Sequence, residues 1–405
     1  MNRNDSGVSL LAEKCAGIAT EEAEKAAARG TFGVGGLLIE NSTGKVLKKV
    51  PNRVIVRDTV VDPTAHVEKQ LVDWYYLSKS SLPLAADMTI ICSLDPCIMC
   101  TGAILRSGLN VIRISDDSEC GVSCWGQNDL TTLPAELRQE KAARFSAFGL
   151  RGNKRAFAGS QGSIFSGIEI DPLFEKRSTK AFRSSLDKIR KSINKDWIFS
   201  PDSLENPRSL AKSKPLSRVV KTIKRYNPDA FSEKHTLDRG ASCTALGHVL
   251  VDKARESHRY TGLFNSACII DPFGNILLAG GANPVEQTPL LDIMRKYHSL
   301  VNDAGKNGKR YLAHPKYCKV AIFFGPARDP TGMMEVGSLG SFFEGKLPKE
   351  SRGQLEYVLP RQDASELADM LRNLPPFYSE TVNLKNVIQQ TQDDALKEFC
   401  KARIP

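Results

Sequence analysis

The sequence has 405 residues, 41% hydrophobic and 25% charged, which excludes a largely disordered chain and leaves room for two domains of about 150–200 residues. No apolar run reaches the length of a membrane helix and the first residues lack the apolar core of a signal peptide, so we expect a soluble, cytoplasmic protein without membrane contact. The net charge of +10 originates in residues 141–230, where 20 Lys or Arg and 8 Asp or Glu give a net of +12; the rest sums to −2.

The first fifty residues predict a helix followed by two strands. A segment rich in Ala, Glu and Lys predicts a helix over 9–28. A buried strand over 32–40 and a returning strand over 45–50 follow it. Gly35 and Gly36 lack the G-x-G-x-x-G spacing of a dinucleotide fold, and we expect them to let a ligand approach the backbone.

The next elements predict an α/β fold. Apolar residues at helical spacing predict a helix over 64–78, and an apolar strand over 88–93 follows it. A second helix begins at Pro96 and ends near Gly108, and another strand covers 111–115. This order predicts an α/β sandwich in which helices cover a mixed sheet.

The middle of the chain has a different composition. Residues 151–166 are rich in Gly and Ser and predict a loop, and 176–193 predict a basic amphipathic helix. Residues 199–215 have the composition of a linker. We therefore expect a first domain over 1–198 and a second over 216–405.

The second domain repeats the order of elements of the first. A helix over 241–254, a strand–turn–strand over 266–279 and an apolar strand over 319–324 follow one another as in the first domain. We therefore expect two tandem copies of one fold. An unrelated α/β domain is the simpler alternative.

Two short motifs in the first domain carry metal-binding chemistry. Cys97 and Cys100 lie three residues apart at the start of a predicted helix, so both thiols project from one face. The helix N-terminus favours thiolates, which bind metal. His66, at the start of the other predicted helix, supplies a nitrogen ligand. Three such ligands suit zinc and leave a fourth position open, as in catalytic sites.

Glu68 is the expected proton carrier of this site. It lies two residues after His66, so both side chains reach one site only from the first helical turn. The order H-x-E followed by P-C-x-x-C is the signature of the zinc deaminases, in which water is activated and the Glu moves protons. A structural zinc site is the alternative, although such sites usually have four protein ligands.

The segments around these motifs resemble the bacterial tRNA adenosine deaminases of the cytidine-deaminase-like superfamily. The resemblance lies in Asn52-Arg53, in residues 62–68 and in residues 96–104. It implies a cytidine-deaminase-like α/β/α sandwich with a mixed sheet, with zinc as the cofactor. The implied site consists of the zinc ligands His66, Cys97 and Cys100, the proton shuttle Glu68, and the substrate-binding residues Asn52, Gly35, Gly36 and Pro96.

Two departures from the family pattern, and one shared pattern, limit the resemblance. Asp95 stands where the family commonly has Glu, and Val67 replaces a usual Ala. Guanine deaminases share much of the same pattern. The resemblance therefore leaves the identity of the base open.

The second domain is expected to be metal-free. Aligning the two domains places Asn283 at Asn52 and residues 288–292 at residues 64–68, so that Leu290 replaces the histidine. Residues 327–332 contain no thiol. This copy resembles the pseudo-catalytic partner of eukaryotic heterodimeric tRNA adenosine deaminases, here fused in one chain. The resemblance implies intramolecular pairing of the two domains, with further homodimerisation as an option.

The sequence therefore predicts a hydrolase that acts on an amidine C–N bond, with adenosine-to-inosine editing of tRNA as the expected reaction. The basic segment favours RNA as the partner, although a solvated helix face is the alternative explanation of its charge. Two other functions stay open. One is deamination of free guanine, cytidine or a deoxynucleotide, and the other is a non-catalytic, zinc-stabilised RNA-binding module.

Overall fold

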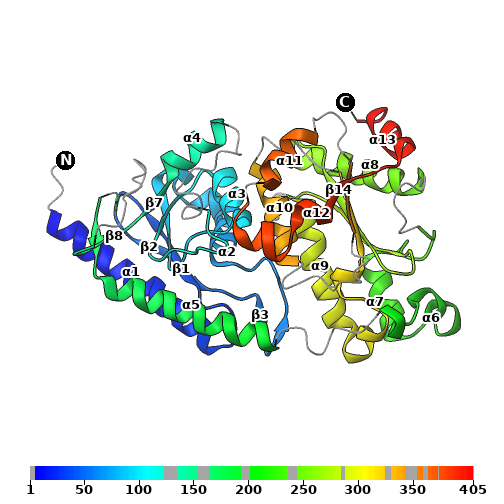
Figure 1. The fold of residues 1–405 in the computed structure, drawn as a ribbon, viewed down its shortest axis with the longest axis horizontal. Helices are drawn as coiled ribbons and strands as arrows, with labels where there is room; N and C mark the ends of the chain where they lie inside the picture. Colours follow the sequence, from blue (N-terminus) through cyan, green and yellow to red (C-terminus); the bar gives the residue numbers. More distant parts are fainter. Residues whose placement is uncertain are drawn as a thin grey trace. The chain divides into compact units, whose positions relative to one another are not determined.

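Two five-stranded sheets organise the chain, one in each of two units (Figure 1). The first unit consists of Met1–Val60, Ala65–Ile193 and Arg328–Gly337, and the second of Val61–Thr64, Asn194–Ala327 and Ser338–Pro405. Each is therefore completed by a short segment from the other half of the sequence. This computed structural model describes residues 5–122, 135–153, 164–165, 167–192, 201–235, 244–283, 288–323, 330–342, 354–358, 364–372 and 374–404.

The first sheet is mixed, as predicted, and has the strand order β2–β1–β5–β6–β7. Strand β1 is antiparallel to β2 and β5, whereas β5, β6 and β7 are parallel. Every residue of β5 and β6 is buried, which explains why these strands read as continuous apolar runs. The strands are β1 (Gly35–Glu40), β2 (Val46–Pro51), β5 (Met88–Cys92), β6 (Asn110–Arg113) and β7 (Phe145–Ala147).

Helices cover this sheet, and the two long ones, α1 and α5, lie side by side (Figure 1). Helix α1 packs against Leu37, Ile39 and Ile91 of the sheet in one apolar core. Helices α2 and α3 contact each other, and α2 also contacts β1, β2 and β5. The helices are α1 (Asp5–Ala28), α2 (Val67–Ser78), α3 (Ile98–Ser107), α4 (Ala135–Arg144) and α5 (Pro172–Ser192).

The predicted helices of the first unit are present with shifted ends. Helix α2 begins three residues later than predicted, because Oδ1 of Asp62 accepts hydrogen bonds from the backbone N–H and hydroxyl of Thr64 and holds a turn there. Most of the loop predicted over 151–166 lies outside the described residues. Unpredicted elements are α4, β7, the hairpin β3 (Ile55–Val56) and β4 (Thr59–Val60), and the parallel pair β8 (Gly149–Leu150) and β9 (Glu169–Ile170).

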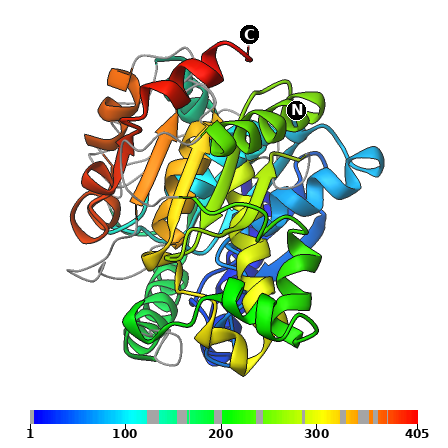
Figure 2. The ribbon, with the colours of Figure 1, turned by 90° about the vertical axis from the view of Figure 1, so that its right-hand side faces the viewer.

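The second sheet repeats the topology of the first, in the order β11–β10–β12–β13–β14 (Figure 2). Strand β10 is antiparallel to β11 and β12, and β12, β13 and β14 are parallel. The register shift between Ile269 and Ile270 matches the one between Leu38 and Ile39. The prediction of two tandem copies of one α/β fold is confirmed. The strands are β10 (Ser266–Ile270), β11 (Ile276–Gly281), β12 (Lys319–Phe323), β13 (Gln354–Val358) and β14 (Ile388–Gln390).

The helices of the second half begin inside the segment 199–215 that we expected to be a linker. Arg208 of α6 donates hydrogen bonds to Oδ1 of Asn275 and to the carbonyls of Phe231 and Glu233, so this segment belongs to the second unit. Within the described residues, no helix combines the length and apolarity needed to cross a bilayer. The helices are α6 (Pro207–Ser213), α7 (Arg218–Tyr226), α8 (Thr244–Thr261), α9 (Pro289–Ala304), α10 (Pro330–Phe342), α11 (Ala364–Arg372), α12 (Leu384–Val387) and α13 (Asp394–Lys401).

Shorter helical turns complete the described elements. They are η1 (Lys79–Ser81), η2 (Ala85–Asp87), η4 (Pro201–Ser203), η5 (Lys306–Arg310), η6 (Pro315–Tyr317) and the π-helical turn η7 (Phe377–Thr381).

The start of α10 packs closely against α3 within the first unit. A Cβ atom on Gly102 of α3 would lie 2.6 Å from the carbonyl oxygen of Pro330 and 2.7 Å from Cγ of Met334. A Cβ on Gly337 of α10 would lie 2.2 Å from the backbone nitrogen of Met99. Both glycines are therefore required for the two helix backbones to approach each other.

Candidate active site

His66 lies immediately before helix α2, in an extended conformation with φ −66° and ψ 155°. The preceding carbonyl, of Ala65, accepts hydrogen bonds from the backbone N–H of Arg53 at 3.1 Å and from Nε2 of Gln70 at 2.9 Å. The carbonyl of His66 accepts the helical bond from the N–H of Gln70. These bonds fix the backbone from which the imidazole projects.

Cys97 and Cys100 are positioned by the start of helix α3. Cys97 occupies the position that precedes the first helical residue, and Cys100 lies in the first turn. A short segment packs alongside: Cys97 forms an isolated antiparallel bridge with Gly121, and the N–H of Val122 donates to the carbonyl of Pro96 at 3.1 Å. What the structure shows for Pro96 is this backbone contact, so the role that we predicted for it in substrate binding stays a prediction.

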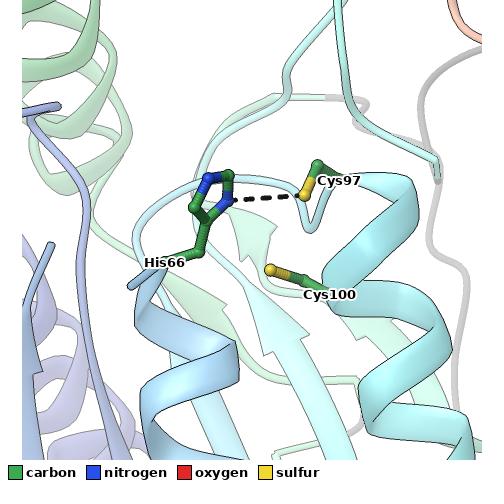
Figure 3. Close-up of side chains that lie close together, drawn as sticks. All are labelled: His66, Cys97 and Cys100. Atoms are coloured by element: carbon green, nitrogen blue, oxygen red, sulfur yellow. Dashed lines mark hydrogen bonds between the residues drawn. The ribbon is translucent and has the colours of Figure 1, made fainter. Parts of the chain in front are cut away.

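The structure brings the three predicted ligands together (Figure 3). The imidazole and the two sulfur atoms point toward one another, and their ligand atoms all lie within 4.8 Å of one another. Nδ1 of His66 is 3.5 Å from Sγ of Cys97. One nitrogen and two sulfur donors match the ligands that zinc prefers; His66 is partly exposed, and the two cysteines are buried.

The two thiols differ in their acidity. A hydrogen bond with Cys100 is the main cause that holds the pKa of the Cys97 thiol well below its usual range, and the His66 imidazole is a further cause. Burial holds the pKa of the Cys100 thiol well above its usual range. Cys97 is thus the more acidic of the two thiols, and metal binding would deprotonate both.

Glu68 lies in the first turn of α2 with only 4% of its surface exposed. Burial is the main cause that raises the pKa of its carboxyl, followed by the negative charge of Cys97. Its Oε1 is 2.6 Å from Sγ of Cys92, the last residue of β5. A carboxyl with a raised pKa close to the ligand cluster is suited both to accept and to return a proton.

Asn52 follows strand β2 and is 4% exposed. Its Oδ1 accepts hydrogen bonds from the hydroxyl of Thr31 at 2.7 Å and the N–H of Val54 at 3.0 Å. These bonds fix the orientation of the carboxamide, so its Nδ2 is the side that donates. That side has the chemistry needed to recognise an acceptor on a base or ribose, which is the role we predicted.

The chain itself packs tightly against Gly35 and Gly36. A Cβ on Gly35 would lie 2.2 Å from the backbone nitrogen of Ala23 in α1, and a Cβ on Gly36 would lie 2.7 Å from Cγ1 of Val67 in α2. Helices on the two faces of β1 therefore explain why neither residue has a side chain. Lining of a substrate pocket by these glycines stays a prediction.

A buried acidic turn beside Cys97 was missed by the sequence analysis. Asp117 accepts hydrogen bonds from the N–H groups of Glu119 and Cys120, and burial raises its pKa to about 6. Gly121 closes the turn so tightly that a Cβ there would lie 2.3 Å from Oδ2 of Asp95. In the sequence, Asp117 followed closely by Gly121 was the signal that could have revealed this turn.

The corresponding region of the second unit contains a different set of residues. Helix α9 begins at Pro289 after the capping residue Thr288, just as α2 begins after His66. This places Thr288 at the histidine and Leu290 at Glu68, so our alignment of 288–292 with 64–68 was wrong by two residues. The helix start is fixed by the Thr288 hydroxyl, which accepts from the N–H of Leu291.

A second alignment is also corrected, whereas the expectation that the second domain is metal-free stays a prediction. Pro51 and Gly281 end strands β2 and β11 opposite Gly35 and Ser266, so the residue that corresponds to Asn52 is Ala282 and not Asn283. In the described part of the second unit, no three His, Cys, Asp or Glu side chains form a metal-binding group.

The comparisons with known proteins give a family match within the first unit and several similar solved structures. Residues 11–115, which include all three ligands and Glu68, match the family model of the cytidine and deoxycytidylate deaminase zinc-binding region. A solved structure from studies of A-to-I editing by tRNA:A34 deaminases at the wobble position of transfer RNA is 24% identical, with a TM-score of 0.26, and the match covers 30% of this chain and 89% of that one. Guanine deaminase from Nitrosomonas europaea is 16% identical, with a TM-score of 0.26 and coverage of 43% and 83%.

Proposed function

We propose that this protein is a zinc-dependent nucleobase deaminase of the cytidine-deaminase superfamily and that it converts adenosine to inosine in tRNA. Residues 11–115, which match the zinc-binding region of that family, contain the residues that would carry out the reaction. The observation that carries the chemistry is the buried Glu68 carboxyl beside a cluster of one imidazole and two thiols. Three protein ligands are typical of catalytic zinc, since a structural site is usually closed by a fourth.

The reaction replaces the exocyclic amino group of the base with oxygen from water and releases ammonia. His66, Cys97 and Cys100 would hold the zinc, which would supply Lewis-acid chemistry that lowers the pKa of water toward neutral pH. Glu68 accepts a proton from the attacking water, donates it to the adjacent ring nitrogen of the base, and delivers the second proton to the leaving amino group. Its raised pKa suits both directions of transfer.

RNA as the substrate is supported by a row of cations along helix α5. The buried side of this helix faces the core through Ser178, Ala181 and Ser185. The opposite side is exposed to solvent, where a stripe of positive charge can contact successive phosphates. The exposed cations of this stripe are Lys176, Lys180, Arg183, Arg190 and Lys191; the exposed Asp187 lies among them, and Arg190 pairs with Glu119.

Contacts along α5 tie the stripe to the candidate active site. Ser185 accepts a hydrogen bond from the N–H of Gly33 at 2.7 Å. Ile189 packs in an apolar cluster with Val54, two residues from Asn52. Arg190 pairs with Glu119 at 2.5 Å, in the turn that leads to Gly121. The C-terminal half of the basic helix therefore lies beside the turn and strand that flank the zinc ligands.

A loop of folded RNA fits this arrangement better than an intact duplex. A base must leave its stack to reach a buried metal, and loops present unstacked bases at the lowest cost. The carboxamide of Asn52 would then bind the presented base or its ribose, and α5 would bind the flanking phosphates.

The test is incubation of the zinc-loaded protein with tRNA, followed by sequencing for inosine, with Glu68→Gln as the matched control. We expect turnover by the wild type and a loss of about 10²- to 10⁴-fold in the variant, which removes the proton carrier with little change in shape. Equal zinc content in the two proteins would show that the metal site is intact.

Parallel incubations with free guanine, cytidine and a deoxynucleotide identify the alternative substrates. Conversion of a free base without any conversion of tRNA would contradict the proposal. Binding of tRNA with no turnover of any substrate would instead support a non-catalytic RNA-binding module.

A further inference from the structure

Cys92 makes a contact that packing in the core does not by itself explain. It is the last residue of β5 and is fully buried. Its Sγ lies 2.6 Å from Oε1 of Glu68. Glu68 is nearly as buried, so a donor at this position contacts the carboxyl where water is largely excluded.

We propose that Cys92 is a positioning residue, whose S–H group donates a hydrogen bond to Oε1 of Glu68 and fixes the orientation of the carboxyl. The inference rests on the proposed role of Glu68 as proton carrier and concerns how that group is held. With Oε1 engaged by the thiol, the rotation of the carboxyl is restricted, and Oε2 is left to exchange protons with water and base.

The backbone around Cys92 is built for this contact. Cys92 pairs with Gly36 of the neighbouring strand β1. A Cβ on Gly36 would lie 2.7 Å from Cγ1 of Val67 and 3.5 Å from Cα of Cys92. The absence of that side chain lets the first turn of α2 lie directly on β1 and β5, which brings Glu68 against the thiol.

A thiol has suitable chemistry for this position. Burial holds the pKa of Cys92 well above its usual range, so the side chain stays protonated and keeps its hydrogen for donation. It is also uncharged. A lysine or arginine would hold the carboxyl in its ionised form, whereas a weak neutral donor orients the group and still lets it take up a proton.

The contact can be tested with two variants of nearly equal shape. Cys92→Thr replaces the thiol donor with a hydroxyl donor, and Cys92→Val fills similar space without a donor. We expect Cys92→Val to lower kcat about 10- to 100-fold with little change in KM, on the scale seen when an outer supporting residue is removed from a metal site. Cys92→Thr should recover most of that loss.

Matched controls separate this effect from packing. Cys15 is a fully buried cysteine of helix α1, so Cys15→Thr and Cys15→Val repeat the two changes away from Glu68. Neither control should change kcat. Equal losses in Cys92→Thr and Cys92→Val, or unchanged kcat in Cys92→Val, would overturn the proposal.

An infrared measurement tests the hydrogen bond without using activity. In the zinc-loaded protein Cys97 and Cys100 are thiolates, so the S–H stretching band of Cys92 can be assigned by its loss in Cys92→Thr. We expect this band to shift to higher frequency in Glu68→Ala, because the acceptor is gone. An unshifted band would overturn the contact. If the wild type deaminates no substrate, the proposed function fails, and the infrared result still decides whether this hydrogen bond exists.

Discussion

Replacing Gly35 with alanine distinguishes between two explanations of this glycine. The sequence suggests that it lets a ligand approach, whereas the structure shows helix α1 against it. A Cβ at this position would lie 2.2 Å from the backbone nitrogen of Ala23 and 2.4 Å from the carbonyl oxygen of Ala19. Both atoms belong to helix backbone, so no flexible side chain can move aside, and α1 itself must shift by about 1 Å to reach ordinary contact distance.

The expected cost of this shift follows from its geometry. Overpacking of this kind costs about 1–3 kcal/mol. In a unit of about 200 residues, each kcal/mol lowers Tm by about 2–4 °C. Gly35→Ala should therefore lower the Tm of the zinc-loaded protein by about 2–12 °C, measured by circular dichroism.

The control is Gly7→Ala in α1, where a new Cβ meets nothing within 4 Å. This substitution should stabilise the helix slightly, because alanine has the higher helix propensity. An unchanged Tm in Gly35→Ala, accompanied by a raised KM for the substrate, would refute the packing explanation and support the ligand explanation.

Three further predictions follow from individual side chains. His66→Ala should weaken zinc binding by more than about 100-fold in chelator competition, since even outer partners of zinc ligands cost 10- to 100-fold; retained affinity would exclude this ligand set. Burial raises the pKa of Asp271 to about 6, above its unfolded value of about 3.9, so its contribution to the free energy of unfolding falls as pH rises from about 4 to 6. Asp271→Asn should remove this fall, which amounts to up to about 3 kcal/mol over that pH range when the free energy of unfolding is measured in urea. An unchanged pH dependence in the variant would contradict the assignment. Lys180→Ala and Arg183→Ala should each weaken tRNA binding and reduce its salt slope by about 1, whereas the exposed Lys45→Ala should change neither; equal effects at all three sites would remove α5 from the RNA surface.

The metal cluster could be predicted from sequence because its ligands are local signals. Cys97 and Cys100 are set by helical spacing, and His66 precedes a recognisable helix. The repeat was also detectable, since the order of apolar strands persists after the residues themselves have diverged. Both predictions depended on patterns within short stretches of chain.

What the sequence could not provide depends on contacts between distant residues. Cys92 resembles any buried strand residue until folding places Glu68 beside it, 24 positions away. The sequence likewise does not show that α1 packs against Gly35, so packing as a second explanation of this glycine comes from the structure alone. The alignment of 288–292 failed because one hydrogen bond to the Thr288 hydroxyl sets the first residue of α9.

The packing of α10 against α3 has a genetic consequence. A stop codon between residues 194 and 327 would preserve His66, Glu68, Cys97 and Cys100 in the translated chain, yet it would delete Arg328–Gly337, which belong to the same unit. Gly102, which admits the backbone of Pro330, would then face solvent along the helix that carries Cys100. Truncating alleles of this kind should therefore behave as folding defects, even though every residue of the zinc motif is still encoded.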